Sequence, residues 1–317
     1  MTMIVFLDGR FVEALKAKVS IFDHGFLYGD GVYETLRTYG GKIWQLDEHL
    51  RRLTNSAKML GLKLPVSRAQ IGEWVREVVR RNESADRLKL SSRARNARRC
   101  EWRMRITLTR GQNSFDFLSC KKPTLVIAVQ KLKSEPQAIY RQGVLVVTVK
   151  MERFLPEAKT ISLLPFILAR RGMARKRAYE GIFVDARGYV REGTITNVFM
   201  VKDGVLWTPK SGILPGTTRE VVLKIVRGMG GRGKVIPAGG PVVRVADFKL
   251  AQLYAADEVF LTNAPRGIIP VREIDGRKIG RAKTICPGPI TRKIQIEFAK
   301  KILGKFRFDN LFSKRYP

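Results

Sequence analysis

Three stretches of the sequence contain residue types that could do chemistry. They are GFLYGDGVYETLR (25–37), AKTISLLPFILAR (158–170) and YVREGTITNVF (189–199), the last continuing to SGILPGTTR (211–219). Lys159 follows a strand-like segment and precedes an apolar helix, and a deprotonated lysine amine is a good nucleophile. Glu192 adds a carboxylate, and the helix that opens at 216–218 presents free N–H groups to an anion.

Each of these residues also has an ordinary explanation. Lys159 is one of 60 Lys and Arg residues and could be a solvated charge. Glu192 could belong to a surface turn, and Thr217 or Thr218 could satisfy its own helix as a cap. Other kinds of site have no support, because the sequence has no GxGxxG or P-loop opening a helix, no HExxH and no paired CxxC. Neither a serine or cysteine triad nor a metal centre is expected.

Length and composition exclude several classes of protein. A chain of 317 residues predicts about two domains of ~150 residues each. No eighteen consecutive residues are apolar, so a membrane span is not expected, and the first residues lack the pattern of a secretory signal. Cys100, Cys120 and Cys286 are too widely spaced for a disulfide framework or a zinc site, which favours a cytoplasmic protein.

The charge is unusual. Lys and Arg number 60 against 28 Asp and Glu, giving +32, and such a chain retains nucleic acid nonspecifically whatever its role. Residues 87–110 hold nine Lys or Arg and one Glu. This segment is either a basic, nucleic-acid-binding insertion or a local divergence in an ordinary connection. Trp102 is its one aromatic residue, which weakens the case for single-strand recognition.

Hydrophobic periodicity predicts mixed strands and helices in both halves, hence an α/β fold. Hairpins are expected at Asp8-Gly9 and Asp203-Gly204. Strands are expected at 32–39, 42–46, 104–111, 123–130, 144–150 and 258–262. Helices are expected from a cap at Asp47 to Gly61, from a Ser67–Gln70 capping box, and at 162–178, 217–228, 246–254 and 289–303. The predicted domains are 1–133 and 141–305, with a linker at 134–140 and a basic tail at 306–317.

Taken together, the three stretches resemble the class IV aminotransferases, the fold type IV pyridoxal-phosphate enzymes. That family includes branched-chain amino acid aminotransferases, D-amino acid aminotransferases and aminodeoxychorismate lyases. The resemblance runs from about residue 3 to about residue 300 and is interrupted at 83–103. It implies a two-domain α/β fold like that of D-amino acid aminotransferase, with pyridoxal 5'-phosphate in the cleft between the domains. It also implies a homodimer in which the partner's loop near Tyr28 closes the site.

The resemblance assigns roles to the residues of the motifs. Lys159 is expected to form the Schiff base, or aldimine, with the cofactor aldehyde and then to move a proton between Cα and C4′. Glu192 is expected against the pyridine nitrogen, where a carboxylate keeps the ring protonated and electron-withdrawing. Arg52 matches the phosphate arginine, and Leu214 the residue that packs on the ring. Asn197 is expected to fix the turn after the Glu192 motif.

The remaining cofactor contacts concern the phosphate. Gly216, Thr217 and Thr218 open the helix that is expected to receive it. Many family members add a threonine near 262–264. Ala264 occupies the aligned position here, so only Thr262 or a backbone amide can serve.

The subfamily rests on fewer residues. The segment YGDGVYE (28–34) is closest to the D-amino acid enzymes and lyases, yet the Arg-x-His carboxylate trap is missing after Thr109-Arg110-Gly111. Arg37 and Arg105 match arginines around the substrate carboxylate of branched-chain enzymes, where a guanidinium donates two hydrogen bonds at once. Tyr28 and Tyr33 match aromatic residues of their substrate pocket.

Two features favour other subfamilies. Leu163 stands where branched-chain enzymes have a tyrosine, and Thr-Asn-Ala-Pro (262–265) is similar to the lyases. The expected activity is transfer of the amino group of a branched-chain L-amino acid to 2-oxoglutarate. The alternatives are a D-amino acid aminotransferase or an aminodeoxychorismate lyase on the same fold. A basic nucleic-acid-binding protein that has lost activity is the alternative of another class.

Overall fold

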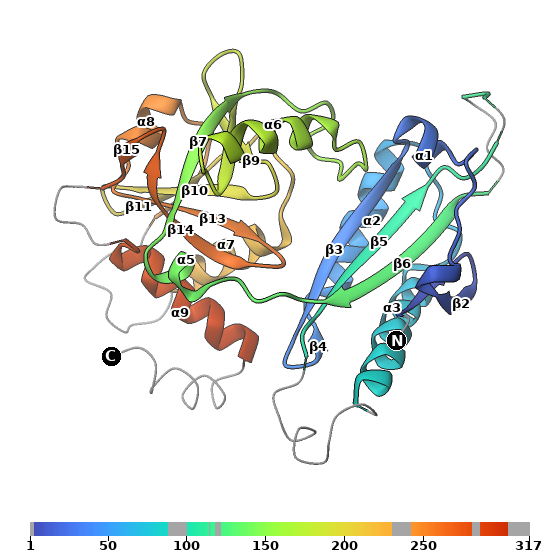
Figure 1. Ribbon diagram of the computed structural model, residues 1–317. Helices are drawn as coiled ribbons and strands as arrows, with labels where there is room; N and C mark the ends of the chain where they lie inside the picture. Colours follow the sequence, from blue (N-terminus) through green and yellow to red (C-terminus); the bar gives the residue numbers. More distant parts are fainter. Residues whose placement is uncertain are drawn as a thin grey trace. The chain divides into compact units, whose positions relative to one another are not determined.

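The computed structural model describes residues 3–87, 100–113, 115–117, 122–229, 242–280 and 286–303, and the chain divides into two compact units (Figure 1). Residues Met1–Lys133 and Ala158–Leu163 form the first unit; Ser134–Glu157 and Leu164–Pro317 form the second. No local pattern in the sequence indicated that Ala158–Leu163 would group with the first unit. The predicted linker 134–140 belongs to the second unit and enters a short helix, α5 (Gln137–Arg141).

The first unit is built on an antiparallel sheet. Its strands are β1 (Ile4–Leu7), β2 (Arg10–Glu13), β3 (Gly31–Tyr39), β4 (Lys42–Ile43), β5 (Trp102–Thr109) and β6 (Thr124–Lys131). They lie in the order β2-β1-β6-β5-β3-β4. Its helices are η1 (Ala14–Lys16), α1 (His24–Tyr28), α2 (Leu46–Met59) and α3 (Arg68–Arg87). The predicted hairpin joins β1 to β2, with positive φ at both Asp8 and Gly9.

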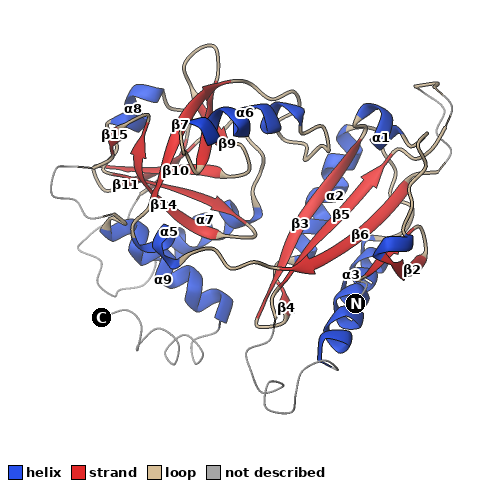
Figure 2. Ribbon diagram, viewed as in Figure 1, coloured by secondary structure: helices blue, strands red, loops and turns tan. Residues whose placement is uncertain are grey.

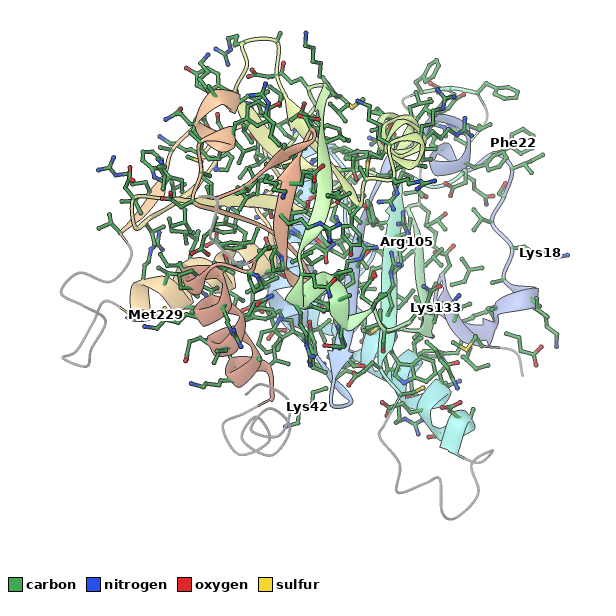
Figure 3. All side chains as sticks on the ribbon, turned by 60° about the vertical axis from the view of Figure 1, so that its left-hand side comes forward. Lys18, Phe22, Lys42, Arg105, Lys133 and Met229 are labelled. Atoms are coloured by element: carbon green, nitrogen blue, oxygen red, sulfur yellow. The ribbon has the colours of Figure 1, made fainter. Side chains whose placement is uncertain are left out.

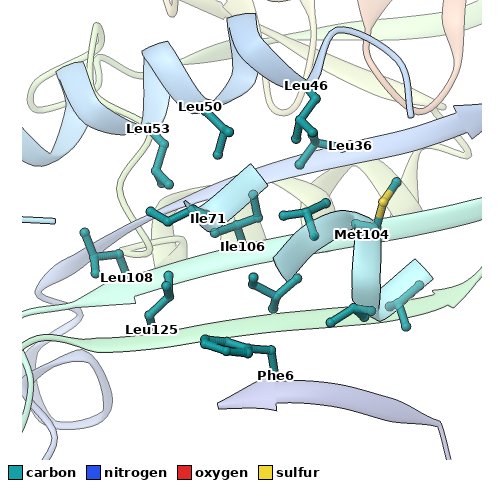
Figure 4. Packing of buried hydrophobic residues seen from close by; sticks show 14 of the residues in the cluster. Phe6, Leu36, Leu46, Leu50, Leu53, Ile71, Met104, Ile106, Leu108 and Leu125 are labelled. Atoms are coloured by element: carbon teal, nitrogen blue, oxygen red, sulfur yellow. The ribbon is translucent and has the colours of Figure 1, made fainter. Parts of the chain in front are cut away.

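Helices α2 and α3 cover one face of this sheet. Alternate strand residues such as Leu36, Met104 and Ile106 point toward the apolar stripes of the two helices, where Leu50 and Ile71 are buried (Figure 4). The intervening strand residues, including Tyr33, Thr35, Arg37, Arg103 and Arg105, therefore lie on the opposite face. We call this opposite side the open face of the sheet.

A short extended segment positions Lys159 beside the open face. The amide of Tyr33 donates to the carbonyl of Lys159 (2.9 Å), the amide of Ile161 donates to the carbonyl of Gly31 (2.9 Å), and Val32 bridges Thr160. Residues 159–161 thus run along the outer edge of β3. This pairing explains why they group with the first unit although they lie far along the chain.

The second unit is built on a mixed sheet (Figure 2). Its strands are β7 (Val144–Lys150), β8 (Glu180–Val184), β9 (Val190–Gly193), β10 (Asn197–Lys202), β11 (Val205–Thr208), β12 (Val243–Val245), β13 (Glu258–Asn263), β14 (Gly267–Ile274) and β15 (Arg277–Lys278). They lie in the order β12-β11-β10-β13-β14-β7-β8-β9, and β15 pairs with β14. The helices besides α5 are α6 (Leu164–Arg175), α7 (Thr217–Met229), α8 (Leu250–Tyr254) and α9 (Pro289–Leu303). Helix α7 packs against α9 and β13, and α6 packs against β8.

Several elements differ from the sequence prediction. Asp47 is not a cap: α2 begins at Leu46, Gln45 is its N-cap, and Asp47 lies in the first turn. Only half of the capping box forms, because the Gln70 amide donates to Ser67 Oγ while the Gln70 side chain turns to Glu73. The helix predicted at 246–254 is reduced to α8, and the central strand β14 was not predicted. The tail 306–317, Cys120 and residues 88–99 lie outside the described residues.

Within the described ranges, no helix is both long enough and apolar enough to span a membrane. The same ranges contain no cluster of three His, Cys, Asp or Glu side chains that could hold a metal ion.

Candidate active site

Lys159 lies against Tyr33 in the first unit. Its Nζ is 4.5 Å from the centre of the Tyr33 ring, and its backbone amide donates to Ser56 Oγ on α2 (3.0 Å). The guanidinium of Arg105 lies 3.9 Å from the same ring. Burial raises the pKa of Tyr33, but the positive charges of Lys159 and Arg105 outweigh this effect, so the net shift is downward. A lysine, an arginine and a tyrosine of lowered pKa therefore meet at one point of the open face.

Arg37 lies on the same face as Arg105 but is directed elsewhere. Its guanidinium lies 3.7 Å from the centre of the Tyr39 ring, and its Nε donates to the carbonyl of Thr38 (3.0 Å). Arg105 instead leans toward Tyr33, and its Nε donates to Thr107 Oγ1 (3.2 Å). Arg105 is therefore the predicted substrate arginine that lies beside Lys159. The position of Arg105 on the first unit is labelled in Figure 3.

On the helix-covered face of the sheet, the carboxylate of Glu34 is buried between the side chains of Arg52 and His49. Glu34 accepts hydrogen bonds from Arg52 Nε (2.6 Å) and Arg52 Nη2 (2.8 Å), and its Oε2 lies 2.7 Å from His49 Nδ1. Burial alone would raise the pKa of Glu34, but Arg52 and His49 hold it well below its usual range. Burial also lowers the pKa of His49. The arginine predicted to bind phosphate is thus held rigidly by an ionised carboxylate.

In the second unit, both oxygens of Glu192 are held. One contacts the guanidinium of Arg153, which also donates to the carbonyl of Pro156 (3.0 Å). The other accepts from the amide of Leu214 (2.9 Å). The Glu192 side chain is 5% exposed and the Arg153 side chain 10%. An arginine in this position balances the charge of the carboxylate and fixes its orientation.

Asn197 begins β10, and its side chain holds the turn that leads into α7, not a turn directly after the Glu192 motif. Its Nδ2 donates to the carbonyl of Leu214 (2.9 Å). A Cβ added to Gly216 would lie 1.9 Å from Asn197 Oδ1, so no larger residue fits there. Gly216 provides the first carbonyl of the helix, which accepts from the amide of Glu220 (3.0 Å). The N-terminus of α7 is thereby placed next to Asn197.

Two of the four buried hydroxyl groups without a hydrogen-bond partner in the described part of the chain belong to predicted cofactor-binding residues. They are Thr218 Oγ1, in the first turn of α7, and Thr262 Oγ1, on β13. Thr262 pairs with Asn197 in the β10–β13 ladder, which carries it to the same end of the sheet as the α7 turn. A buried hydroxyl without a partner is costly, and an anion at the helix N-terminus would satisfy it. Ala264 lies in the turn after β13.

The predicted site residues therefore form two groups. Lys159, Tyr33 and Arg105 meet in the first unit, with Arg37 on the same face and Arg52 on α2. The second unit brings together five more: Glu192, Leu214, Gly216, Thr217 and Thr218. Tyr28 stands apart from the first group, because its ring packs against Phe117 at 4.8 Å and is 38% exposed.

Sequence reasoning missed four residues that hold these groups in place. They are Glu34, His49, Ser56 and Arg153. The sequence offered a signal for Glu34 alone, which lies inside the motif 25–37. His49 belongs to no recognisable motif, and Arg153 is one of many basic residues. Neither therefore has a local sequence feature that indicates a role in the site.

Comparison with known proteins identifies the family. The family Amino-transferase class IV matches residues 31–274. The putative branched-chain-amino-acid aminotransferase of Methanocaldococcus jannaschii is 34% identical over 93% of this chain and 95% of its own. The aminodeoxychorismate lyase of Bacillus subtilis is 30% identical, over 94% of both chains. The D-alanine aminotransferase of Staphylococcus aureus (strain N315) is 33% identical over 94% of this chain and 97% of its own.

Solved structures with a similar fold support the same family assignment. A branched-chain amino acid aminotransferase from T.th., solved with pyridoxamine 5'-phosphate, superposes with a TM-score of 0.81. It is 28% identical, covering 95% of this chain and 94% of its own. The branched-chain aminotransferase of Thermoproteus uzoniensis with norvaline superposes with a TM-score of 0.80 at 30% identity, covering 96% of each chain. None of these relatives supports the alternative of an inactive nucleic-acid-binding protein.

The residues present fit the cofactor of this family. A phosphate matches the α7 N-terminus and the two buried hydroxyl groups of Thr218 and Thr262, which lack partners in the described ranges. A carboxylate that is already oriented, Glu192, suits a ring nitrogen that must carry a proton. Lys159 offers an amine to an aldehyde. The chain belongs to the class IV aminotransferases, fold type IV enzymes that use pyridoxal phosphate.

Proposed function

We propose that this enzyme moves the amino group of a branched-chain L-amino acid to 2-oxoglutarate. The observation that carries the proposal is the position of Arg105, whose guanidinium shares the Tyr33 ring with Lys159. A substrate α-carboxylate held by Arg105 would present its Cα to the Lys159 amine. Similarity to the branched-chain enzymes of Methanocaldococcus jannaschii and Thermoproteus uzoniensis supports the same substrate class.

Pyridoxal phosphate, when bound, supplies an aldehyde carbon that takes the amino group and a ring that accepts electron density from Cα. In our proposal the Lys159 amine would hold the cofactor at its aldehyde carbon. When free, the same amine would move a proton between the substrate Cα and C4′.

Glu192 is proposed to keep the ring nitrogen protonated. Its contact with Arg153 and the Leu214 amide leaves lone pairs on both oxygens, because a carboxylate accepts about four hydrogen bonds. Arg52, Thr218, Thr262 and the first amides of α7 are proposed to bind the phosphate. Leu214 is proposed to pack on the ring, and Ala264 to contribute only through its backbone.

We also propose that the enzyme is a homodimer. Five aromatic side chains are exposed in the first unit: Phe22, Phe26, Tyr28, Phe115 and Phe117. Phe22 packs on Phe115, and Tyr28 packs on Phe117, so they are not scattered singly. Exposed aromatic pairs of this kind are characteristic of an interface, and the occupant proposed here is a second copy.

The homodimer is tested by measuring mass in solution. The double variant Phe26→Ser, Phe117→Ser should shift light-scattering mass from the dimer toward the monomer. Leu15→Ser is the matched control, an 86% exposed apolar residue of the first unit outside the aromatic group. A wild-type monomer, or a double variant that remains fully dimeric, would refute this interface.

The substrate is tested with a panel assayed on the wild-type holoenzyme. L-leucine, L-valine, D-alanine and aminodeoxychorismate are compared by kcat/KM, each amino acid with 2-oxoglutarate as acceptor. The proposal expects L-leucine to be preferred. A preference for D-alanine would instead support the activity of the D-alanine aminotransferase relative, and conversion of aminodeoxychorismate would support that of the lyase relative. Arg105→Gln should weaken every α-carboxylate substrate, while Arg105→Lys should recover part of the loss.

A further inference from the structure

Arg191 lies in the motif 189–199, directly before Glu192, and the proposed site gives it no role. It is on β9, and its side chain is 5% exposed. Taking a guanidinium out of water is costly unless charged and polar groups surround it. The partners of Arg191 therefore show what its burial achieves.

One side of the guanidinium is anchored on Asp185. Arg191 Nη2 donates to Asp185 Oδ2 (2.6 Å), and Arg191 Nε donates to the same oxygen (3.2 Å). The other oxygen of Asp185 accepts from the amides of Arg187 and Tyr189, each at 2.9 Å. Asp185 is therefore fixed by the turn between β8 and β9, and it holds the guanidinium in one orientation.

The other side of the guanidinium holds Ser211, in the turn that leads from β11 to α7. Arg191 Nη1 donates to the carbonyl and to the hydroxyl of Ser211, both at 3.0 Å, and lies 3.2 Å from Asp247 Oδ2. Asp247 in turn accepts from the Ser211 hydroxyl and from the amides of Lys210 (2.9 Å) and Ser211 (3.0 Å). Ser211 is thus held through its carbonyl, hydroxyl and amide by one arginine and the carboxylate paired with it.

The backbone next to Ser211 packs on the same side chain. Gly212 has a φ of 67°, and a Cβ added to it would lie 2.8 Å from Arg191 Cδ and 2.9 Å from Arg191 Nε. A larger residue would therefore push the turn away from the arginine. Arg191 thus also sets how closely this turn approaches β9.

The turn that Arg191 holds at Ser211 is held by Glu192 at Leu214. The Leu214 amide donates to Glu192 (2.9 Å), and the Leu214 carbonyl accepts from Asn197 Nδ2 (2.9 Å). Arg191 and Glu192 are neighbours on β9, and successive side chains of a strand leave it in opposite directions. Two adjacent residues of one strand therefore fix both ends of the segment 211–214.

We propose that Arg191 is a positioning residue that acts on the cofactor through the segment 211–214. By holding Ser211, it keeps the Leu214 amide on Glu192 and the Leu214 side chain in place for the ring of pyridoxal phosphate. The inference rests on the proposed roles of Glu192 and Leu214. It gives Arg191 no contact with the substrate.

The first test is a titration of the apoenzyme with pyridoxal phosphate, which involves no substrate. Arg191→Gln removes both the charge and the fork of donors, so the dissociation constant should rise about tenfold to a hundredfold, the usual worth of hydrogen bonds to a charged group. Arg191→Lys keeps the charge without the fork and should recover part of the loss. Ser211→Ala leaves the charges in place and should raise the constant by less, and it carries the titration if Arg191→Gln does not fold.

Asp275→Asn is the matched control for a purely structural loss. Asp275 accepts from the amide (2.9 Å) and the hydroxyl (2.8 Å) of Thr148 and from the Tyr254 hydroxyl (2.8 Å), all in the same unit. None of these residues belongs to the segment 211–214 or to the predicted cofactor contacts. This variant should have a lower melting temperature and the dissociation constant of the wild type.

A double-mutant cycle on kcat tests whether Arg191 acts through Glu192. With saturating pyridoxal phosphate and the best amino donor of the wild type, Arg191→Lys should lower kcat. The same change should cost less in Glu192→Gln, because the residue through which it acts has already been replaced.

Each measurement can contradict the inference. Wild-type dissociation constants in the Arg191 variants and in Ser211→Ala would overturn it, as would losses in kcat that simply add in the double variant. If Glu192→Gln alone keeps the wild-type kcat, the proposed role of Glu192 fails. The titration then still decides whether Arg191 positions the segment 211–214.

Discussion

At the scale of single residues, the buried ion pair of Glu34 and Arg52 supports a direct prediction. Glu34→Gln would leave the Arg52 guanidinium buried without a counter-charge. Breaking one side of a buried pair costs about 3–5 kcal/mol, so the free energy of unfolding in urea should fall by that order. Glu77→Gln is the control, because Glu77 pairs with Arg80 and Arg81 on the solvent side of α3 and exposed pairs contribute little.

The same residue predicts a dependence of stability on pH. The folded-state pKa of Glu34 lies well below its ordinary value of 4.5. A depressed pKa stabilises the folded state fully above the unfolded value, and the stabilisation disappears as the pH falls below it. Unfolding free energies of the wild type should therefore decline below about pH 4.5 more steeply than those of Glu34→Gln. If the unfolding free energies of the wild type and Glu34→Gln fall in parallel with pH, the titration of Glu34 does not contribute to the loss of stability in acid.

Glu192 supports a prediction about rate. Glu192→Gln keeps the shape of the side chain and can still accept from the Leu214 amide, so the protein should still bind cofactor. A neutral amide cannot hold a proton on the ring nitrogen, and kcat should fall by orders of magnitude. Cofactor retention is measured by absorbance after gel filtration and kcat by steady-state assay. A variant with wild-type kcat would assign the role to another acid.

At the scale of elements, the turn into α7 depends on the absence of a side chain at Gly216. In Gly216→Ala the new Cβ would meet Asn197 Oδ1 at 1.9 Å, so the turn or the asparagine must move. We expect a lower melting temperature and weaker binding of pyridoxal phosphate in a titration of the apoenzyme.

Gly228→Ala is the control within the same helix. A Cβ at Gly228 meets nothing within 4 Å, and alanine favours helix by about 0.5–1 kcal/mol over glycine. This variant should be as stable as the wild type or more so, with unchanged cofactor affinity. Equal behaviour of the two variants would mean that the Gly216–Asn197 contact does not shape the turn.

Elements with clear local signals could be predicted from the sequence. Both Asp-Gly hairpins and helices α7 and α9 lie where turn residues and apolar stripes place them. Strand β14 was not predicted because Pro270 lies in its interior, and a proline argues against a central strand. Asp47 was wrongly predicted as the N-cap because an acidic residue in the first turn of a helix looks the same in the sequence as a capping residue.

At the scale of the whole chain, motif residues were recognisable, but their partners were not. The side chain that supports the Lys159 amide is Ser56, 103 residues earlier. Arg153, which contacts Glu192 across 39 residues, follows β7 without any local feature that separates it from other basic residues. Such contacts depend on strand pairing over long sequence separations, which periodicity does not encode.

The central claim is that Lys159 carries the cofactor, and one measurement tests it directly. Wild-type holoenzyme is reduced with borohydride, digested, and searched by mass spectrometry for the lysine that has gained the phosphopyridoxyl group. We predict that this group is found on the peptide containing Lys159 and is absent from Lys159→Ala prepared in the same way. A phosphopyridoxyl group on a different lysine, or none on any peptide of the wild type, would contradict the claim.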